Sequence, residues 1–382
     1  MRASFNTIVK ALLNQVTGQG GKRLGQLALL LSAASAGSAY ALSCGSNNGF
    51  VCQGSAQQFS ANFSPATGYG GFGGGDCTAS KTPVIFIHGN GDSALSLDMP
   101  PAKVTGYPQA ANSVYAELKA QGYRDCELFG ITYLSEAERS APQNNYHSTS
   151  KYAILQTFID RVKTYTGKSQ VDIVAHSMGV SMALASLHYY NSWASVRRFI
   201  NLAGGLRGLA SCYQTGYANA LAATCGSQNL FDSTTFGFFP EGWYYATWVT
   251  NNWTGAGTAA SLREMPGRHS GVQFYTLAAG FKDQVACSTT SFTATCDQGA
   301  KFTSAANVKA QLNLGAGNNA AQVDWNWADG MPYNLGGGDT SNGVGHFRVK
   351  NNSGSGIARM LLTTCTGLDC AATYLSGPKS NY

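Results

Sequence analysis

Apolar, β-branched runs recur along the chain and alternate with segments whose apolar side chains return at helical spacing. The runs predict strands at residues 83–87, 126–133, 171–175, 196–202, 272–278 and 308–314. Between them, one helical pattern includes Val114, Tyr115 and Leu118, and a clearer one extends from Tyr152 to Tyr165 and stops at Gly167. This alternation predicts an α/β fold, with a mostly parallel sheet flanked by helices on both faces.

One strand leads into a turn that is typical of a catalytic nucleophile. Residues 171–184 read VDIVAHSMGVSMAL, which is an apolar strand, a tight turn with Ser177 at its centre, and a helical pattern. A strand, sharp turn and helix in this order form a nucleophile elbow, which exposes the serine hydroxyl. Gly179 fits the small residues that the turn requires, whereas Ala175 replaces the more usual glycine. The alternative is a serine that only caps the helix.

A serine hydroxyl needs a base, and the base needs an acid that fixes its tautomer. Of the six histidines, only His346 follows every plausible acid-bearing strand, and its glycine-flanked segment GVGHF predicts a loop over the elbow. Asp283 follows the strand 272–278 after a short turn. The order Ser177, Asp283, His346 is that of the α/β-hydrolase fold. Four other aspartates, which lack a strong preceding strand, compete for the role of the acid: Asp297, Asp324, Asp329 and Asp339.

The oxyanion hole should combine two backbone N–H groups. One comes from Met178, which follows the nucleophile, and the other from Asn90 in the glycine-rich loop after the first strand. His88 in that loop precedes the serine, so we expect it to brace the loop through hydrogen bonds rather than act as the base. The remaining histidines have no motif around them and are expected to be structural: His147, His176, His188 and His269.

A long segment, residues 205–270, separates two of the predicted strands and is expected to overhang the active site. Between Tyr213 and Trp253 it holds 11 aromatic residues in 41, with only Asp232 and Glu241 charged. Most of these aromatics should pack together, but so little charge also predicts an exposed apolar surface. Such a surface suits a water-insoluble ester, either a lipid or a polyester.

The first 41 residues predict an export signal. They hold four basic residues and no acidic one, an apolar run at 24–31, and an A-x-A cleavage site at Ala39–Ala41. Removing them lowers the formal charge from +6 to +2, and no basic stripe suggests nucleic-acid binding. No segment is long and apolar enough to span a membrane. We expect a secreted, extracellular monomer with one catalytic domain at 42–382, and a mobile surface loop at Gly68–Gly75.

The ten cysteines are even in number, and an exported chain should form disulfides. Their spacing suggests the pairs 44/52, 212/225, 287/296 and 365/370, which leaves 77 with 126, although sequence alone leaves the connectivity open. The cysteines are Cys44, Cys52, Cys77, Cys126, Cys212, Cys225, Cys287, Cys296, Cys365 and Cys370. No cysteine or histidine cluster has the spacing of a metal site, so we expect no metal and no cofactor.

From about Leu42 to Tyr382 the chain resembles the secreted depolymerases of native, amorphous poly(3-hydroxybutyrate) granules, which are lipase-like α/β-hydrolases. The resemblance rests on TPVIFIHGNG at 82–91, QVDIVAHSMGV at 170–180, FGFFPEGWYY at 236–245, AGFKDQV at 279–285 and NGVGHF at 342–347. It implies the triad Ser177, Asp283 and His346, an oxyanion hole at Met178 and Asn90, and short 3-hydroxybutyrate oligomers as products. It also implies contact with the granule surface through exposed aromatics, for which the candidates are Tyr146, Tyr217, Phe231 and Trp248.

Two other functions remain open from the sequence. A triacylglycerol lipase or carboxylesterase would share the same chemistry on a different ester. A noncatalytic granule-binding protein would keep the fold without the reaction.

Overall fold

The structure is a computed structural model, and it describes only part of the chain. The chain divides into two units, residues 1–41 and 42–382, and all of the described residues belong to the second. The predicted export segment and the boundary after Ala41 therefore lie outside the described residues. The described residues are 59–99, 112–145, 147–206, 224, 266–280, 283, 285, 299–314, 345–371 and 380–381.

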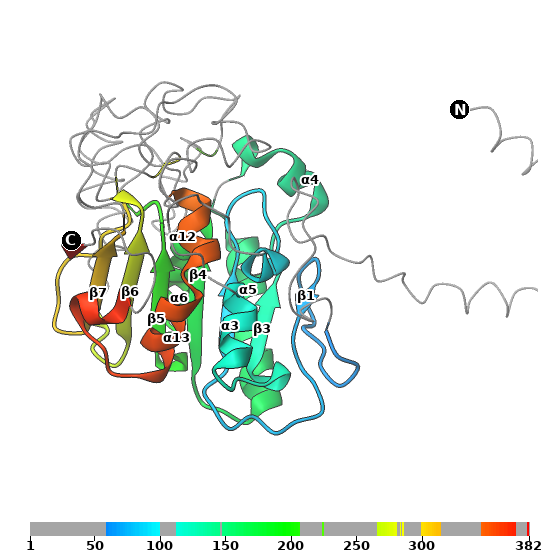
Figure 1. The fold of residues 1–382 in the computed structure, drawn as a ribbon. Helices are drawn as coiled ribbons and strands as arrows, with labels where there is room; N and C mark the ends of the chain where they lie inside the picture. Colours follow the sequence, from blue (N-terminus) through cyan, green and yellow to red (C-terminus); the bar gives the residue numbers. More distant parts are fainter. Residues whose placement is uncertain are drawn as a thin grey trace, which may run out of the picture. The chain divides into compact units, whose positions relative to one another are not determined.

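The described residues form one sheet of eight strands in the order β1-β3-β2-β4-β5-β6-β7-β8 (Figure 1). The six strands between the two edges, in the order β3-β2-β4-β5-β6-β7, are all parallel to one another. At the edges, β1 pairs with β3 and β8 pairs with β7, both antiparallel. The α/β-hydrolase fold predicted from the sequence is confirmed. The strands are β1 (Gly71–Phe72), β2 (Val84–Ile87), β3 (Leu128–Ile131), β4 (Val171–His176), β5 (Val196–Leu202), β6 (Gln273–Ala278), β7 (Val308–Asn313) and β8 (Ser380–Asn381).

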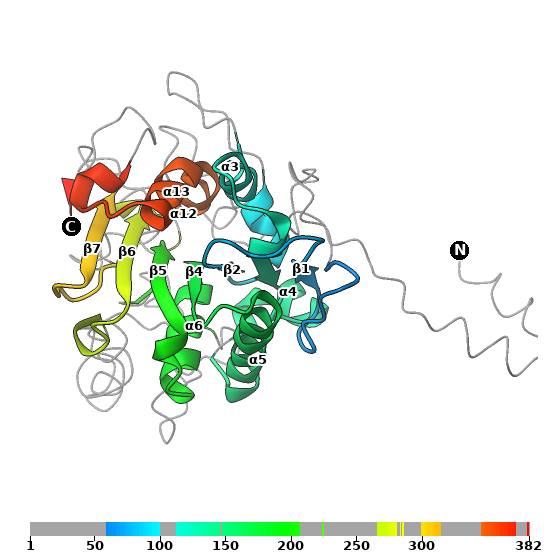
Figure 2. The same ribbon diagram turned by 90° about the horizontal axis from the view of Figure 1, so that it is seen from below.

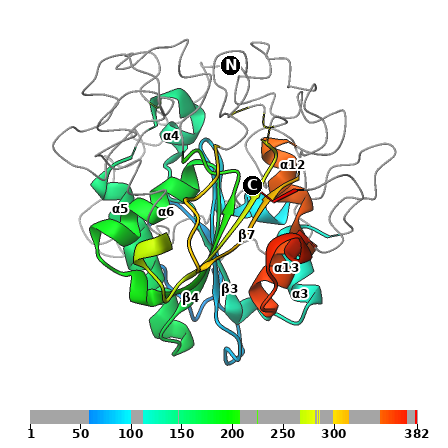
Figure 3. The same cartoon turned by 90° about the vertical axis from the view of Figure 1, so that its left-hand side faces the viewer.

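Helices cover both faces of the sheet. Figures 2 and 3 show α5 and α6 on one face and α3, α12 and α13 on the other. The helices are α3 (Val114–Ala120), α4 (Glu136–Ser140), α5 (Thr149–Thr166), α6 (Met178–Tyr189), α12 (His346–Asn352) and α13 (Gly354–Leu362). Short 3₁₀ turns lie at η1 (Ala94–Asp98), η2 (Asp125–Glu127), η3 (Pro142–Asn144), η4 (Trp193–Ser195) and η10 (Gly367–Ala371). No helix in the described parts of the chain is both long and apolar enough to cross a membrane.

Each central strand is buried on both faces, as a parallel sheet between helices requires. In β2, Ile85 and Ile87 belong to the core under α5 and α6, whereas Val84 and Phe86 belong to the core under α3 and α13. This explains why the strands appear in the sequence as continuous apolar runs instead of alternating ones.

The prediction of a mobile surface loop at Gly68–Gly75 is wrong for part of that segment. Gly71 and Phe72 form β1 and pair with β3, and Phe72 is buried with its ring centroid 5.3 Å from that of Tyr115. A Cβ on Gly71 would lie 2.0 Å from the carbonyl oxygen of Gly130. The glycine thus allows two backbones to approach closely. The many glycines of this segment favour a flexible loop in the sequence, so this steric role could not be predicted from it.

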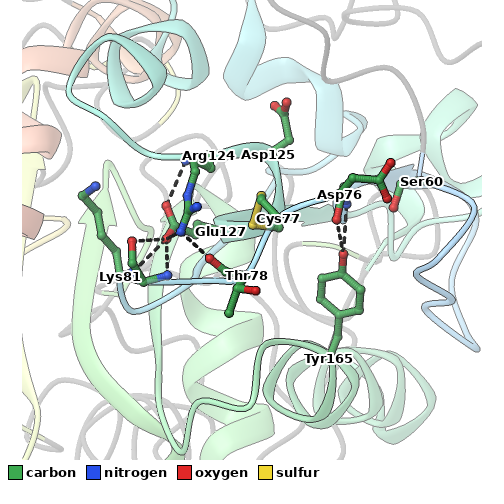
Figure 4. Close-up of a disulfide and its surroundings, with 12 residues drawn as sticks. Ser60, Asp76, Cys77, Thr78, Lys81, Arg124, Asp125, Glu127 and Tyr165 are labelled. Atoms are coloured by element: carbon green, nitrogen blue, oxygen red, sulfur yellow. Dashed lines mark hydrogen bonds and ion pairs between the residues drawn. A yellow bond between two sulfur atoms is a disulfide. The ribbon is translucent and has the colours of Figure 1, made fainter.

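A disulfide joins the segments that precede β2 and β3 (Figure 4). Cys77 and Cys126 are bonded, with a Cα–Cα distance of 5.8 Å. Beside them the buried Glu127 carboxylate accepts hydrogen bonds from the backbone N–H groups of Ser80 (2.6 Å), Lys81 (2.8 Å) and Arg124 (2.9 Å). Burial alone would raise the pKa of Glu127, but these hydrogen bonds outweigh it and lower the pKa.

The bonds Cys77–Cys126 and Cys365–Cys370 confirm two of the five pairs that spacing suggested. No described cysteine is free. The other six cysteines lie outside the described residues: Cys44, Cys52, Cys212, Cys225, Cys287 and Cys296.

Removing the Cys77–Cys126 bond should cost more stability than removing Cys365–Cys370, because it closes a longer loop. The sequence separations are 49 and 5 residues. The loop-entropy relation gives losses of about 4 and about 2 kcal/mol for the two double-alanine variants. Urea unfolding of both variants beside the wild type measures the difference, and equal losses would contradict it.

Candidate active site

Ser177 occupies a strained turn between β4 and α6. Its backbone has φ 55° and ψ −128°, a conformation that non-glycine residues rarely adopt. The Ser177 N–H donates to the Leu202 carbonyl (2.9 Å), and the Ser177 carbonyl accepts from the Val180 N–H (3.0 Å), so the end of β5 and the first turn of α6 hold the turn. Within residues 171–187 only Ser177 is not fully buried. These are the features of a nucleophile elbow.

Two glycines bring the loop after β2 against this turn. A Cβ on Gly179 would lie 2.3 Å from the carbonyl oxygen of His88, and one on Gly89 would lie 3.0 Å from the Cβ of Ser177. Larger residues at either position would therefore push the loop and the elbow apart. The loop and the elbow meet at the carboxyl ends of β2 and β4.

The sheet reverses its strand order at this place. From β2 the chain proceeds to β3 on one side, and then returns to β4 on the other side of β2. In open α/β sheets such a switch point leaves a crevice beyond the carboxyl ends of the strands, where ligands bind. Ser177 and Gly89 both lie at this end.

Asp283 and His346 are 63 residues apart in sequence but in direct contact. The Nδ1–H of His346 donates to both carboxylate oxygens of Asp283, at 3.0 and 2.9 Å. The proton is assigned to Nδ1 because a carboxylate only accepts. Both side chains are buried. In this tautomer the lone pair of the ring lies on Nε2.

Asp283 follows β6 after a short turn, as the sequence predicted. His346 was expected in a loop, but it is the first residue of α12, directly after Gly345. The two glycines before it favour a loop in the sequence, but the chain enters the helix directly after Gly345.

His176, the residue before the elbow serine, brings His346 to the same place. Its Nε2–H donates to the backbone carbonyl of His346 (3.0 Å), and the two ring centroids are 4.8 Å apart. Burial lowers the pKa of His176 well below its usual value, so the ring is neutral. The sequence placed His176 among the purely structural histidines, and its position next to Ser177 was the signal that it missed.

The loop after β2 carries the predicted second oxyanion donor. The Asn90 side chain is held by the segment 142–145: its Nδ2 donates to the Pro142 carbonyl (2.8 Å), and its Oδ1 accepts from Asn145 Nδ2 (2.7 Å). Among the described residues, neither the Asn90 N–H nor the Met178 N–H has an acceptor. Neither backbone donor is therefore used by another described residue.

His88 braces this loop, as predicted. Its Nδ1–H donates to the Gly89 carbonyl (2.7 Å), its Nε2 accepts from the Tyr133 N–H (3.2 Å), and its ring stacks on Tyr133 with centroids 4.4 Å apart. Burial lowers the pKa of His88 from 6.5 to about 4. The neutral ring suits its partners, because a proton on Nε2 would face the Tyr133 N–H.

We expect the protein to lose stability as the pH falls from about 6.5 to about 4. In this window His88 takes a proton in the unfolded chain but not in the folded one. A shift of this size corresponds to about 3 kcal/mol, fully present above pH 6.5 and lost by about pH 4. Urea unfolding at several pH values measures the slope. His88→Gln should flatten it, whereas His188→Gln, at an exposed histidine, should not; parallel curves for wild type and His88→Gln would contradict the assignment.

A second serine and histidine pair lies nearby but lacks the features of a nucleophile. His147 Nε2 and Ser181 Oγ are 2.9 Å apart, and the Ser181 hydroxyl donates to the Met178 carbonyl (3.0 Å). The other ring nitrogen of His147 faces the hydroxyl of Tyr152, at 3.1 Å, instead of a carboxylate. Ser181 and His147 are both fully buried. The remaining histidine, His269, is half-buried and stacks on Trp193.

The substrate-binding aromatics predicted from the sequence lie outside the described residues, as do the four competing acids. The aromatics are Tyr146, Tyr217, Phe231 and Trp248. Within the insertion 205–270, Thr224 is described, and its hydroxyl donates to the Pro142 carbonyl (2.7 Å), which Asn90 also uses. Thr224 therefore contacts the segment that supports the loop 88–91. No group of metal-ligating side chains occurs among the residues that the structure describes.

Residues 81–236 match the family model of class 2 lipases. The match covers about two fifths of the chain and includes the β2 loop and the elbow, but neither Asp283 nor His346. Together with the fold and the elbow, it supports a carboxylic ester hydrolase of the lipase type. No curated protein is similar enough to the chain to count as a match.

Solved structures with a similar fold include lipases and a carboxyl esterase. A mature Bacillus licheniformis lipase is 17% identical, with 54% of this chain and 69% of that one covered and a TM-score of 0.34. Aspergillus fumigatus lipase B is 14% identical over 82% and 61% of the two chains, with a TM-score of 0.39. A metagenomic carboxyl esterase is 13% identical over 54% and 53%, with a TM-score of 0.31. The chain thus spans less than two thirds of the last two, and likenesses of this size carry no information about its substrate.

Proposed function

We propose that the chain is an extracellular serine esterase that hydrolyses amorphous poly(3-hydroxybutyrate) to short oligomers through Ser177, His346 and Asp283. The observation that carries the esterase chemistry is the strained Ser177 turn beside a buried pair of His346 and Asp283. The family match supports the same chemistry. The granule as substrate rests on the sequence resemblance and on the aromatic, nearly uncharged insertion.

The reaction follows the two-step course of serine esterases. His346 Nε2 takes the proton of the Ser177 hydroxyl as its oxygen attacks the ester carbonyl, and the Met178 and Asn90 N–H groups stabilise the oxyanion. The protonated His346 then gives its proton to the leaving alkoxide, and an acyl-enzyme remains. In the second step His346 takes a proton from water, whose oxygen attacks the acyl-enzyme, and then returns the proton to Ser177 as the acid is released. Asp283 holds Nδ1–H throughout, so that Nε2 is the nitrogen that takes and returns the proton.

The insertion is the proposed surface for the polymer. The hydrogen bond from Thr224 to the Pro142 carbonyl, which also accepts from Asn90 in the proposed oxyanion loop 88–91, supports this proposal. We propose that Tyr146, Tyr217, Phe231 and Trp248 contact the polymer there.

A turbidity assay tests the proposed substrate. Purified protein is added to amorphous poly(3-hydroxybutyrate) granules and, in parallel, to a tributyrin emulsion, with Ser177→Ala as the blank. Clearing of granules with little effect on tributyrin supports the depolymerase. Clearing of tributyrin alone would overturn it in favour of a triacylglycerol lipase, which the family match equally permits. Granule binding without hydrolysis of either would favour a noncatalytic binding protein.

A further inference from the structure

A buried ion pair links the helix of His346 to the oxyanion loop. Lys350 lies one turn after His346 on α12, and its ammonium group donates to the Oδ2 of Asp92 (3.2 Å). Asp92 follows the loop 88–91 directly, and its Oδ1 accepts from the Ser93 N–H (2.8 Å). The Lys350 side chain is 2% exposed and that of Asp92 17%. Among the described residues, Asp92 is the only hydrogen-bond partner of the Lys350 ammonium group.

Stability alone is a weak reason for such a pair. Taking an ammonium group out of water costs several kcal/mol, and a buried ion pair is often no more stable than apolar residues of the same size. The buried charge of Lys350 therefore needs an explanation other than stability, and the position of Lys350 on the helix of His346 suggests one.

The helix α12 cannot fix its own position. It has seven residues, and isolated helices of this length are unstable in water. Besides the bond from His346 to Asp283, two polar contacts hold it: His176 donates to the His346 carbonyl at its first residue, and Asp92 accepts from Lys350 one turn later. The first contact comes from the elbow and the second from the oxyanion loop. The base is thus connected to both segments that carry the proposed oxyanion donors.

We infer that Lys350 is a positioning residue, which through Asp92 keeps His346 in register with the oxyanion loop. The inference rests on the proposed function. Lys350 touches no reacting atom; without it the helix loses this ion pair with the residue that follows the loop, and a displacement of about 1 Å at a reacting group lowers rates up to about 100-fold.

The test compares Lys350→Met, Asp92→Asn and the double variant with Arg197→Met as a matched control. Arg197 pairs with the buried Asp172 at the opposite, amino-terminal end of β4 and β5. Hydrolysis of p-nitrophenyl butyrate gives kcat and KM for each protein. Titration with a p-nitrophenyl phosphonate counts the reactive sites, and urea unfolding gives stability.

For Lys350→Met we expect kcat per reactive site to fall about 30-fold while KM changes less than about threefold. The double variant should recover stability, because no unpaired charge is left, but its kcat should stay low. Arg197→Met should lose stability and keep its kcat within about twofold.

A double variant with wild-type kcat would overturn the inference and leave the pair a purely structural one. If neither Lys350→Met nor the double variant folds, Asp92→Asn tests the inference alone, because the amide can still form hydrogen bonds but carries no charge. An unchanged kcat in Asp92→Asn would also overturn the inference. These outcomes differ from a failure of the proposed function, in which the wild type itself hydrolyses no ester.

Discussion

Replacing Ser177 by alanine is expected to lower ester hydrolysis by about 10⁵-fold, while the fold and its stability are kept. The loss is large because base, acid and oxyanion donors act only through the nucleophile, so that its removal disables the whole set. Residual catalysis should come from substrate binding and the oxyanion hole alone. Initial rates on p-nitrophenyl butyrate measure the loss, and circular dichroism checks the fold.

Ser181→Ala is the matched control for that variant. Ser181 is four residues further on, forms a hydrogen bond with the His147 ring, and is buried. Its removal should leave kcat within about threefold of the wild type, since its hydroxyl contacts only the His147 ring and the helix backbone among described residues. The reverse result, with Ser181 essential and Ser177 dispensable, would move the nucleophile to the second pair.

Changing Asp283 to asparagine should lower kcat by about 10⁴-fold with little effect on KM. The carboxylate accepts the Nδ1–H of His346 at 2.9 Å and so favours the tautomer whose Nε2 can take the serine proton. An amide in its place can donate to Nδ1, which favours the tautomer with its proton on Nε2, and that ring is no base toward Ser177. Kinetics on a soluble ester separate kcat from KM.

The control for Asp283→Asn is Asp369→Asn. Asp369 forms an exposed ion pair with Arg359 (2.6 Å), away from the strand ends that carry the site, and its loss should leave kcat unchanged. Near-normal activity in Asp283→Asn would instead assign the acid to one of its competitors: Asp297, Asp324, Asp329 or Asp339.

The strands and the elbow could be predicted from the sequence because their signals are local. Each central strand is an apolar run buried on both faces, and β4 leads into a turn whose small residues have direct steric causes, as at Gly179. The contact of Asp283 with His346 followed from chain order, a property of the fold and not of the residues themselves. The structure brings the two side chains into hydrogen-bond contact, although they are 63 positions apart in the sequence.

What the sequence could not predict depends on contacts between distant segments. Lys350 looks like an ordinary basic residue near a helix end until Asp92, 258 positions earlier, is found beside it. Likewise, no residue near His176 in the sequence indicates that its ring forms a hydrogen bond with the backbone carbonyl of His346. The glycine-rich segment before β2 suggested flexibility, yet Gly71 is there because the backbone of Gly130 leaves no room for a side chain.

The two short antiparallel strands bear on how the molecule behaves in a crowded solution. A parallel sheet has unpaired N–H and C=O groups along its outermost strands, which offer a template for another chain. Here β1 covers β3 and β8 covers β7, each with only two residues. Strands this short pair with part of the backbone N–H and C=O groups of each edge. They also expose too few such groups of their own to bind a strand of another molecule. The sheet is thereby protected against edge-to-edge aggregation at both sides, a useful property for an enzyme proposed to gather on the surface of an insoluble polymer.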